Sequence, residues 1–255
     1  MGRPTGSLKA LISNLIDYAG LYPPAGLPLD RVAEKYEDYR RGPERWILNR
    51  VVLPADQLPE ARMNQDWRVT LLVTRDPGPL PRQVETLETK LAQRFGLPTY
   101  CEAPIENITD GFAKVRTGGL TPDAIPEAEV IAGFLLKAAA RRLPFKATAG
   151  LHHPIRSLHK LTYEAESPAA MMHGFINVFA AAAFAWHGGD GETLVNVLNE
   201  EDASAFEFSD DEMAWRQLRL STAQIRDARR NFAHSFGSCS FEEPVEDLRK
   251  LELIA

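Results

Sequence analysis

Apolar residues recur along the chain in two patterns, one typical of strands and one typical of helices. Short runs rich in β-branched and aromatic residues stop at Pro, Gly or Asp, whereas longer segments repeat apolar residues every three or four positions. The clearest helical pattern covers 127–142, where Ile131, Leu135 and Ala138 share one face. Eight runs are predicted to be strands: 15–21, 47–53, 68–74, 99–105, 111–117, 144–151, 205–209 and 232–236.

Segments with helical spacing separate most of these runs. Parallel strands need such crossovers, so the pattern predicts an α/β fold. Eight units in 255 residues predict one domain over 1–255, a (β/α)8 TIM-type barrel with parallel strands and outer helices. A doubly wound open sheet is the main alternative, although no GxGxxG follows the first run. The predicted helices are 28–40, 55–63, 82–95, 127–142, 168–187, 193–201 and 222–231.

Charge and composition narrow the class of protein. The chain has 29 Lys and Arg against 35 Asp and Glu, so its formal net charge is −6, which argues against nucleic acid and anionic membranes as partners. Two cysteines without a CxxC pair predict neither a disulfide framework nor a zinc ribbon. The first ten residues lack an apolar core, and the longest apolar run, 178–186, is too short for a bilayer. We therefore expect a cytoplasmic protein that binds a small molecule.

Charged residues on three successive predicted strands form the main candidate site. Alternation places Lys114 and Arg116 on one face of the fifth strand, Lys146 on the sixth and Glu102 on the fourth. In a TIM barrel the active site lies at the carboxyl ends of the strands, where these side chains would enter the lumen. The cluster predicts a small phosphorylated or carboxylated substrate, and crowded cations are expected to lower a lysine pKa to about 7–8. An internal salt-bridge network, or surface residues on misassigned strands, would be the structural alternatives.

The run Lys146-Ala-Thr-Ala-Gly150 resembles a strand segment of class I aldolases of the deoxyribose-phosphate aldolase kind. The resemblance covers about eight residues and implies that Lys146 forms a Schiff base with a substrate carbonyl. It also implies that Lys114 is the neighbour that lowers the pKa of Lys146. In this family the second lysine lies on a later strand than the Schiff-base lysine. The sequence departs from the family in this respect, because Lys114 lies on the strand before Lys146.

The run from Arg116 through Thr117 and Gly118 to Gly119 looks like a segment of phosphoribosyltransferase barrels that bind quinolinate. These barrels also line their lumen with Lys and Arg. The resemblance implies that Arg116, Thr117 and Gly118 bind substrate anions.

Histidines follow the sixth predicted strand at the mouth of the barrel. His152 is a candidate general acid or base, because imidazole titrates near neutrality, and His153 and Arg156 are candidate substrate ligands. A structural role with the ring bonded to backbone remains the alternative for each histidine. No HExxH or HxH spacing occurs, so we expect no metal and no cofactor.

The loop after the eighth strand is rich in small and hydroxyl residues. Gly237, Ser238 and Ser240 precede a short predicted helix, and barrels often bind phosphate at such a place. Glu242 and Glu243 in the first turn would repel phosphate, and a tight turn is the alternative.

Two further residues lie near this rim. Asp17, after the first strand, is a candidate proton-transfer group or counter-ion, with a helix or turn cap as the alternative. Cys239 has no partner evident in the sequence, and a lone cysteine is more often inert.

These observations together favour a barrel enzyme acting on a small anionic metabolite, most concretely a Schiff-base aldolase or lyase using Lys146. A phosphoribosyltransferase-like or isomerase-like enzyme that binds its substrate without a covalent bond is one alternative. A non-catalytic binding protein on a barrel scaffold is another; it predicts a lumen closed by apolar side chains, with Lys114 and Lys146 exposed or paired off. The aromatic stripe of Phe175, Phe179, Phe184 and Trp186 is expected to be core or a contact in a homo-oligomer.

Overall fold

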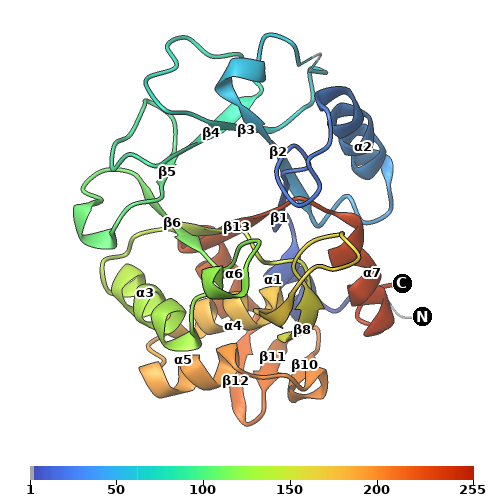
Figure 1. Cartoon of the computed structure of the whole chain (residues 1–255). Coiled ribbons are helices and arrows are strands. Elements are labelled where there is room, and N and C mark those ends of the chain that lie inside the picture. The colour runs from blue at the N-terminus through green and yellow to red at the C-terminus, as the bar shows by residue number, and fades with distance from the viewer. Residues whose placement is uncertain (1–2, 62) are drawn as a thin grey trace.

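Eight parallel strands close into a barrel in the computed structural model, which describes residues 3–61 and 63–255 (Figure 1). The predicted TIM-type α/β barrel is therefore confirmed. Neighbouring strands pair in parallel all round the ring, so their carboxyl ends meet at one end of the barrel. In order around the ring the strands are β1 (Ile16–Tyr18), β2 (Leu48–Pro54), β3 (Val69–Leu72), β4 (Val84–Thr89), β5 (Thr99–Cys101), β6 (Phe112–Arg116), β7 (Phe145–Thr148) and β13 (Ala233–Ser238).

The flanking helices gather on one side of this ring. Figure 1 shows them around β6, β7, β13, β1 and β2, whereas loops surround β3, β4 and β5. Between α2 (Leu29–Arg41) and α3 (Ala128–Ala140), the only helical elements in the described part of the chain are the short 3-10 turns η1 (Ala55–Gln57), η2 (Ile105–Asn107) and η3 (Pro122–Ala124). The helix predicted over 55–63 is therefore reduced to η1. The α-helices are α1 (Gly6–Ile12), α2 (Leu29–Arg41), α3 (Ala128–Ala140), α4 (Phe175–Trp186), α5 (Gly191–Leu198), α6 (Thr222–Asn231) and α7 (Glu242–Lys250).

Aromatic packing fixes α4 against the barrel. Phe145 of β7 stacks on Phe179, and Phe236 of β13 stacks on Phe175, with ring centroids 6.3 and 5.4 Å apart. Phe175 and Phe179 are fully buried, and Phe184 is only 6% exposed. The aromatic stripe predicted as core or subunit contact is therefore core. None of the helices in the described residues is long and apolar enough to cross a membrane.

The prediction over 82–95 is wrong in type. Val84, Leu87, Leu91 and Phe95 have helical spacing, but the chain forms β4 there and pairs with β3 and β5. Leu87 is fully buried, and the Thr86 hydroxyl meets that of Thr70 at 2.8 Å. Pairing with two neighbouring strands, which a single-segment pattern does not contain, overrides the helical spacing.

Two small antiparallel sheets lie outside the barrel. One sheet consists of β10 (Phe206–Phe208), β11 (Glu212–Trp215) and β12 (Leu218–Ser221), with β11 paired to both neighbours. The strand predicted over 205–209 corresponds to β10, so its assignment to the barrel is wrong. The second sheet joins β8 (Ser157–Lys160) to β9 (Ala169–Met172), which replaces the first part of the helix predicted over 168–187. The predicted number of eight barrel strands is right because two errors cancel: β4 is a barrel strand that was predicted as a helix, and β10 was predicted as a barrel strand but lies outside the barrel.

Candidate active site

A pocket of about 380 Å³ opens at the carboxyl ends of the barrel strands. Its charged wall comes from β4, β6 and the residue after β5, with Glu88, Lys114 and Glu102 among its lining. Lys114 lies beside Lys146 of β7 in the parallel register, so the two lysines are neighbours on adjacent strands. The pocket therefore lies where a TIM barrel holds its catalytic groups.

Lys146 is buried beneath this pocket between two carboxylates. Its Nζ lies 2.5 Å from Oδ2 of Asp17 and also pairs with Oε1 of Glu88. Asp17 additionally accepts hydrogen bonds from Asn49 Nδ2 at 2.6 Å and from Ser235 Oγ at 2.9 Å. Lys146 is fully buried and does not contribute to the wall of the pocket. Asp17 thus serves as a counter-ion to Lys146, one of the two chemical roles predicted for it.

Lys114 continues this chain of charges toward solvent. Its Nζ lies 2.7 Å from Oε2 of Glu88 and 3.2 Å from Oε2 of Glu102. Glu102 in turn accepts from Arg116, whose Nη2 is 2.8 Å from Oε1 and whose side chain is 48% exposed. The result is a row of six alternating charges from the barrel interior to the rim: Asp17, Lys146, Glu88, Lys114, Glu102 and Arg116.

Three carboxylates balance three cations in this row, which is the internal salt-bridge network named as the structural alternative for this cluster. Burial alone lowers the pKa of Lys146, but Asp17 and Glu88 outweigh it and raise this pKa above its ordinary value. The expected lowering is therefore wrong for Lys146. Burial alone raises the pKa of Glu88, yet Lys146 and Lys114 lower it to about 2. Glu88 went unrecognised because its segment has helical spacing.

A second polar cluster joins the pocket to α7. Cys239 lines the pocket, and its Sγ lies 3.8 Å from His152 Nε2. His152 Nδ1 is 2.8 Å from Oε2 of Glu243, which also accepts a hydrogen bond from the Tyr163 hydroxyl at 3.1 Å. Burial lowers the pKa of His152, but its hydrogen bonds to Cys239 and Glu243 raise it overall, to about 9. His152 is therefore protonated near neutrality and can donate a proton into the pocket.

Cys239 thus has the partner that the sequence did not reveal. His152 and Cys239 are 87 positions apart, and only the closure of the barrel between β7 and β13 brings the loops after these strands together. Glu243 was considered in the sequence only as a charge that would repel phosphate. In the structure it orients His152 instead.

Thr117 and Gly118 hold neighbouring loops together. The Thr117 hydroxyl donates to the Ala149 carbonyl oxygen at 2.6 Å. A Cβ on Gly118 would lie 2.8 Å from Gly150 Cα, so only glycine fits this close approach. These contacts shape the wall of the pocket, and the substrate-binding role of both residues stays a prediction.

His153 and Arg156 are not among the residues that line this pocket. His153 Nδ1 lies 2.6 Å from Asp247 Oδ2, and its ring stacks on that of His159. Arg156 Nε is 3.9 Å from Glu201 Oε1. Neither residue is brought to the row of six charges.

The loop after β13 is only partly open to the pocket. Gly237 lines it, whereas Ser238 is buried and its hydroxyl accepts the Ser240 N–H at 3.4 Å. Ser240 Oγ accepts the Glu243 N–H at 3.2 Å, and Glu242 and Glu243 form the first turn of α7. These serine oxygens and acidic residues occupy the place predicted for phosphate.

Among residues 3–61 and 63–255, no group of three or more His, Cys, Asp or Glu side chains is arranged to hold a metal ion. Comparison with protein-family models, with curated proteins and with solved structures found no match. The fold and the pocket define a TIM-type barrel with paired lysines at the carboxyl ends of its strands, and the function has to be inferred from this geometry.

Proposed function

We propose that the protein is a Schiff-base lyase of the aldolase type for a small anionic carbonyl compound, with Lys114 as the nucleophile. The observation that carries this proposal is the different placement of the two lysines. Lys114 lines the pocket, whereas Lys146 is fully buried below it with a raised pKa. The geometry therefore favours Lys114 over Lys146, the lysine chosen from the sequence, because a nucleophile must reach the carbonyl carbon of a substrate in the pocket.

Glu88 and Glu102 suit the charge of the covalent intermediate. The amine of Lys114 adds to the carbonyl carbon, and loss of water leaves a positively charged iminium nitrogen in the place of the ammonium group. Carboxylate oxygens 2.7 and 3.2 Å from that nitrogen stabilise the iminium as they stabilise the ammonium. Lys146 and Arg116 hold these carboxylates in place from the far sides.

His152 supplies the proton for the carbon–carbon step. Transfer of a proton from the carbon beside the iminium to Glu102 gives an enamine, whose carbon attacks the carbonyl of a second substrate. The new carbon–carbon bond leaves an alkoxide, which takes a proton from the His152 imidazolium. Water then hydrolyses the iminium, which frees Lys114 as the ammonium, and the proton taken up by Glu102 returns through solvent to His152. The retained contact with Glu243 keeps the ring of His152 oriented throughout.

The size and rim of the pocket support a small anionic substrate. A volume of about 380 Å³ fits a small metabolite. Lys90 also lines the pocket, is exposed, and forms no ion pair with any described residue. Lys90 and the half-exposed Arg116 are the cations for a phosphate or carboxylate on that substrate.

Borohydride trapping tests this assignment. The protein is incubated with pyruvate, acetaldehyde or dihydroxyacetone phosphate, reduced, and mapped by peptide mass spectrometry. We expect an adduct on Lys114 that Lys114→Arg removes and that the exposed-site control Lys137→Arg leaves unchanged. An adduct on Lys146 would overturn the choice of lysine, and the absence of any adduct would remove the covalent mechanism.

A non-covalent transferase or isomerase is the second candidate, favoured by the half-exposed guanidinium of Arg116 beside the pocket. This candidate predicts that activity survives Lys114→Arg and Lys146→Arg but is lost in Arg116→Ala. The binding-protein alternative predicts a lumen closed by apolar side chains, with Lys114 and Lys146 exposed or paired off. The pairing of both lysines with carboxylates fits this alternative, whereas the pocket with charged lining residues at the strand ends argues against it.

A further inference from the structure

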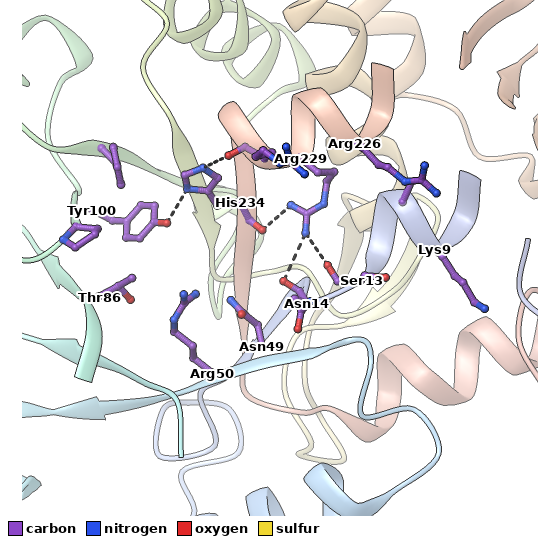
Figure 2. Close-up of a pocket in the computed structure, with 14 residues that line it drawn as sticks. Lys9, Ser13, Asn14, Asn49, Arg50, Thr86, Tyr100, Arg226, Arg229 and His234 are labelled. Carbon is purple, nitrogen blue, oxygen red and sulfur yellow. Dashed lines mark hydrogen bonds between the residues drawn. The ribbon is translucent and has the colours of Figure 1, made fainter. Parts of the chain in front are cut away.

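A larger cavity, of about 700 Å³, lies at the opposite end of the barrel (Figure 2). Its wall combines the amino-terminal parts of β2, β5 and β13 with residues of α1 and α6. Figure 2 shows Tyr100 and His234 on one side of it and Lys9, Arg226 and Arg229 on the other. The proposed active site, at the carboxyl ends of the strands, does not use this cavity.

The charge of the cavity wall is one-sided. Five of its 14 lining residues are Lys or Arg, namely Lys9, Arg50, Arg226, Arg229 and Arg230, and none is Asp or Glu. This contrasts with the whole chain, in which acidic residues outnumber basic ones by 35 to 29. The wall therefore concentrates positive charge that the rest of the protein does not share.

Few of these cations have a counter-ion. Arg50 pairs with Glu85 at 2.8 Å, but Lys9, Arg226 and Arg230 form no ion pair with any residue that the structure describes. The only acidic residue on α6 is Asp227, which accepts from Trp186 Nε1 at 2.7 Å and from Asn231 Nδ2 at 2.8 Å.

Arg229 is held in place by backbone carbonyl oxygens and by the ring of Phe179, whose centroid is 5.1 Å from its Cζ. It donates to the carbonyl oxygens of Ala233, His234, Ser13 and Asn14, the last three at 2.5, 3.1 and 3.5 Å, and its buried Nε has no partner. Burial lowers its pKa to about 10. A guanidinium fixed without a carboxylate is an arrangement that an incoming anion stabilises.

The opposite wall is aromatic and uncharged. His234 Nε2 faces the Arg230 carbonyl oxygen at 3.2 Å and must donate to it, so Nδ1 accepts from the Tyr100 hydroxyl at 2.8 Å. Burial and Arg229 lower the pKa of His234 to about 4, which keeps the ring neutral. The edges of His234 and Phe112 meet with ring centroids 5.5 Å apart. An organic group can pack on this wall while its charges face the arginines.

We propose that this cavity binds a small organic polyphosphate, with its phosphates on Lys9, Arg226 and Arg230 and its organic part toward Tyr100 and His234. Arg229, whose N–H groups are used by backbone carbonyl oxygens, contributes its positive charge to the wall and not a direct contact. Arginine forks match phosphate oxygens in pairs, and several cations without carboxylates favour more than one negative charge. Active sites of TIM barrels lie at the other end, so the bound compound is an effector or a stabilising ligand and not the substrate.

Calorimetric titration with ADP, pyrophosphate and adenosine at low salt tests the proposal. We expect ADP and pyrophosphate to bind, the affinity to fall with added salt, and adenosine not to bind. The variant Arg226→Ala/Arg230→Ala removes two exposed side chains and should weaken ADP binding by about 10- to 100-fold. The control Arg75→Ala removes an exposed arginine outside the cavity and should bind ADP like the wild type.

Absence of ADP and pyrophosphate binding by the wild type would overturn the proposal, as would equal weakening in Arg75→Ala. Binding in Lys114→Arg should equal that of the wild type, because Lys114 lines only the other end of the barrel. The outcome is therefore independent of the proposed lyase activity.

Discussion

Replacing Glu88 with Gln should destabilise the protein by about 3 kcal/mol at neutral pH. The carboxylate is 4% exposed and pairs with both Lys146 and Lys114, so its charge is not screened by solvent. Its pKa falls from 4.5 to about 2 on folding, and at 1.36 kcal/mol per unit this shift is worth about 3 kcal/mol. Removing one partner of a buried ion pair typically costs about 3–5 kcal/mol, the same order of magnitude. Urea unfolding of wild type and Glu88→Gln at pH 7 measures the difference.

The pH dependence of that difference separates charge from packing. A carboxylate whose pKa is lowered by folding stabilises the protein above its unfolded pKa, and this contribution is lost as the pH falls through the folded value. The gap between the two proteins should therefore narrow from about pH 4.5 toward pH 2. Glu85→Gln is the matched control on the same strand, because its side chain is 36% exposed and its ion pairs should contribute less than about 1 kcal/mol. A loss below 1 kcal/mol for Glu88→Gln, or a gap that stays constant with pH, would refute this account of the charge row.

Two more substitution tests address the pocket wall. Iodoacetamide should alkylate Cys239, which lines the pocket, and spare the fully buried Cys101 in a mass-spectrometric time course. His152→Gln should slow the alkylation of Cys239 at neutral pH, because the protonated imidazole next to Sγ stabilises the reactive thiolate. In thermal unfolding, Gly150→Ala should destabilise the protein by more than about 1 kcal/mol, because φ is +80° and the added Cβ would lie 2.7 Å from a backbone atom. The control Gly133→Ala lies in a helix with open space around it and should stabilise the protein by about 0.5–1 kcal/mol.

Much of the barrel could be predicted because local pattern and tertiary pairing agree there. The helix predicted over 222–231 has the observed bounds, since Ser221 and Gln224 form a capping box that is visible in the sequence. The strand over 82–95 could not be predicted, because its apolar spacing matches a helix and only β3 and β5 decide otherwise. Glu88 lies on this strand and was therefore not recognised as a site residue.

The lysine cluster follows from alternation along β6 and β7, which is why Lys114, Lys146 and Glu102 could be placed together from sequence. The raised pKa of Lys146 could not be predicted, because it depends on carboxylates contributed by β1 and β4, which are distant in the chain. The contact between Cys239 and His152 could not be predicted for the same reason, because the two residues are distant in the chain. Contacts between loops of different strands exist only after the barrel closes.

The difference between cations that are paired with carboxylates and cations that are not decides where an anion should bind. The sequence reasoning found the lysines of the carboxyl end with Glu102 and Asp17 near them, but missed Glu88, the carboxylate that pairs with both lysines. Ion pairing leaves Arg116 and Lys90 as the accessible cations there, enough for one anionic group on a substrate. At the amino end the cavity wall holds five basic residues and no carboxylate, and α6 contributes three of them through residues 226–230. A ligand with one charge therefore suits the first pocket, whereas a ligand with several suits the second.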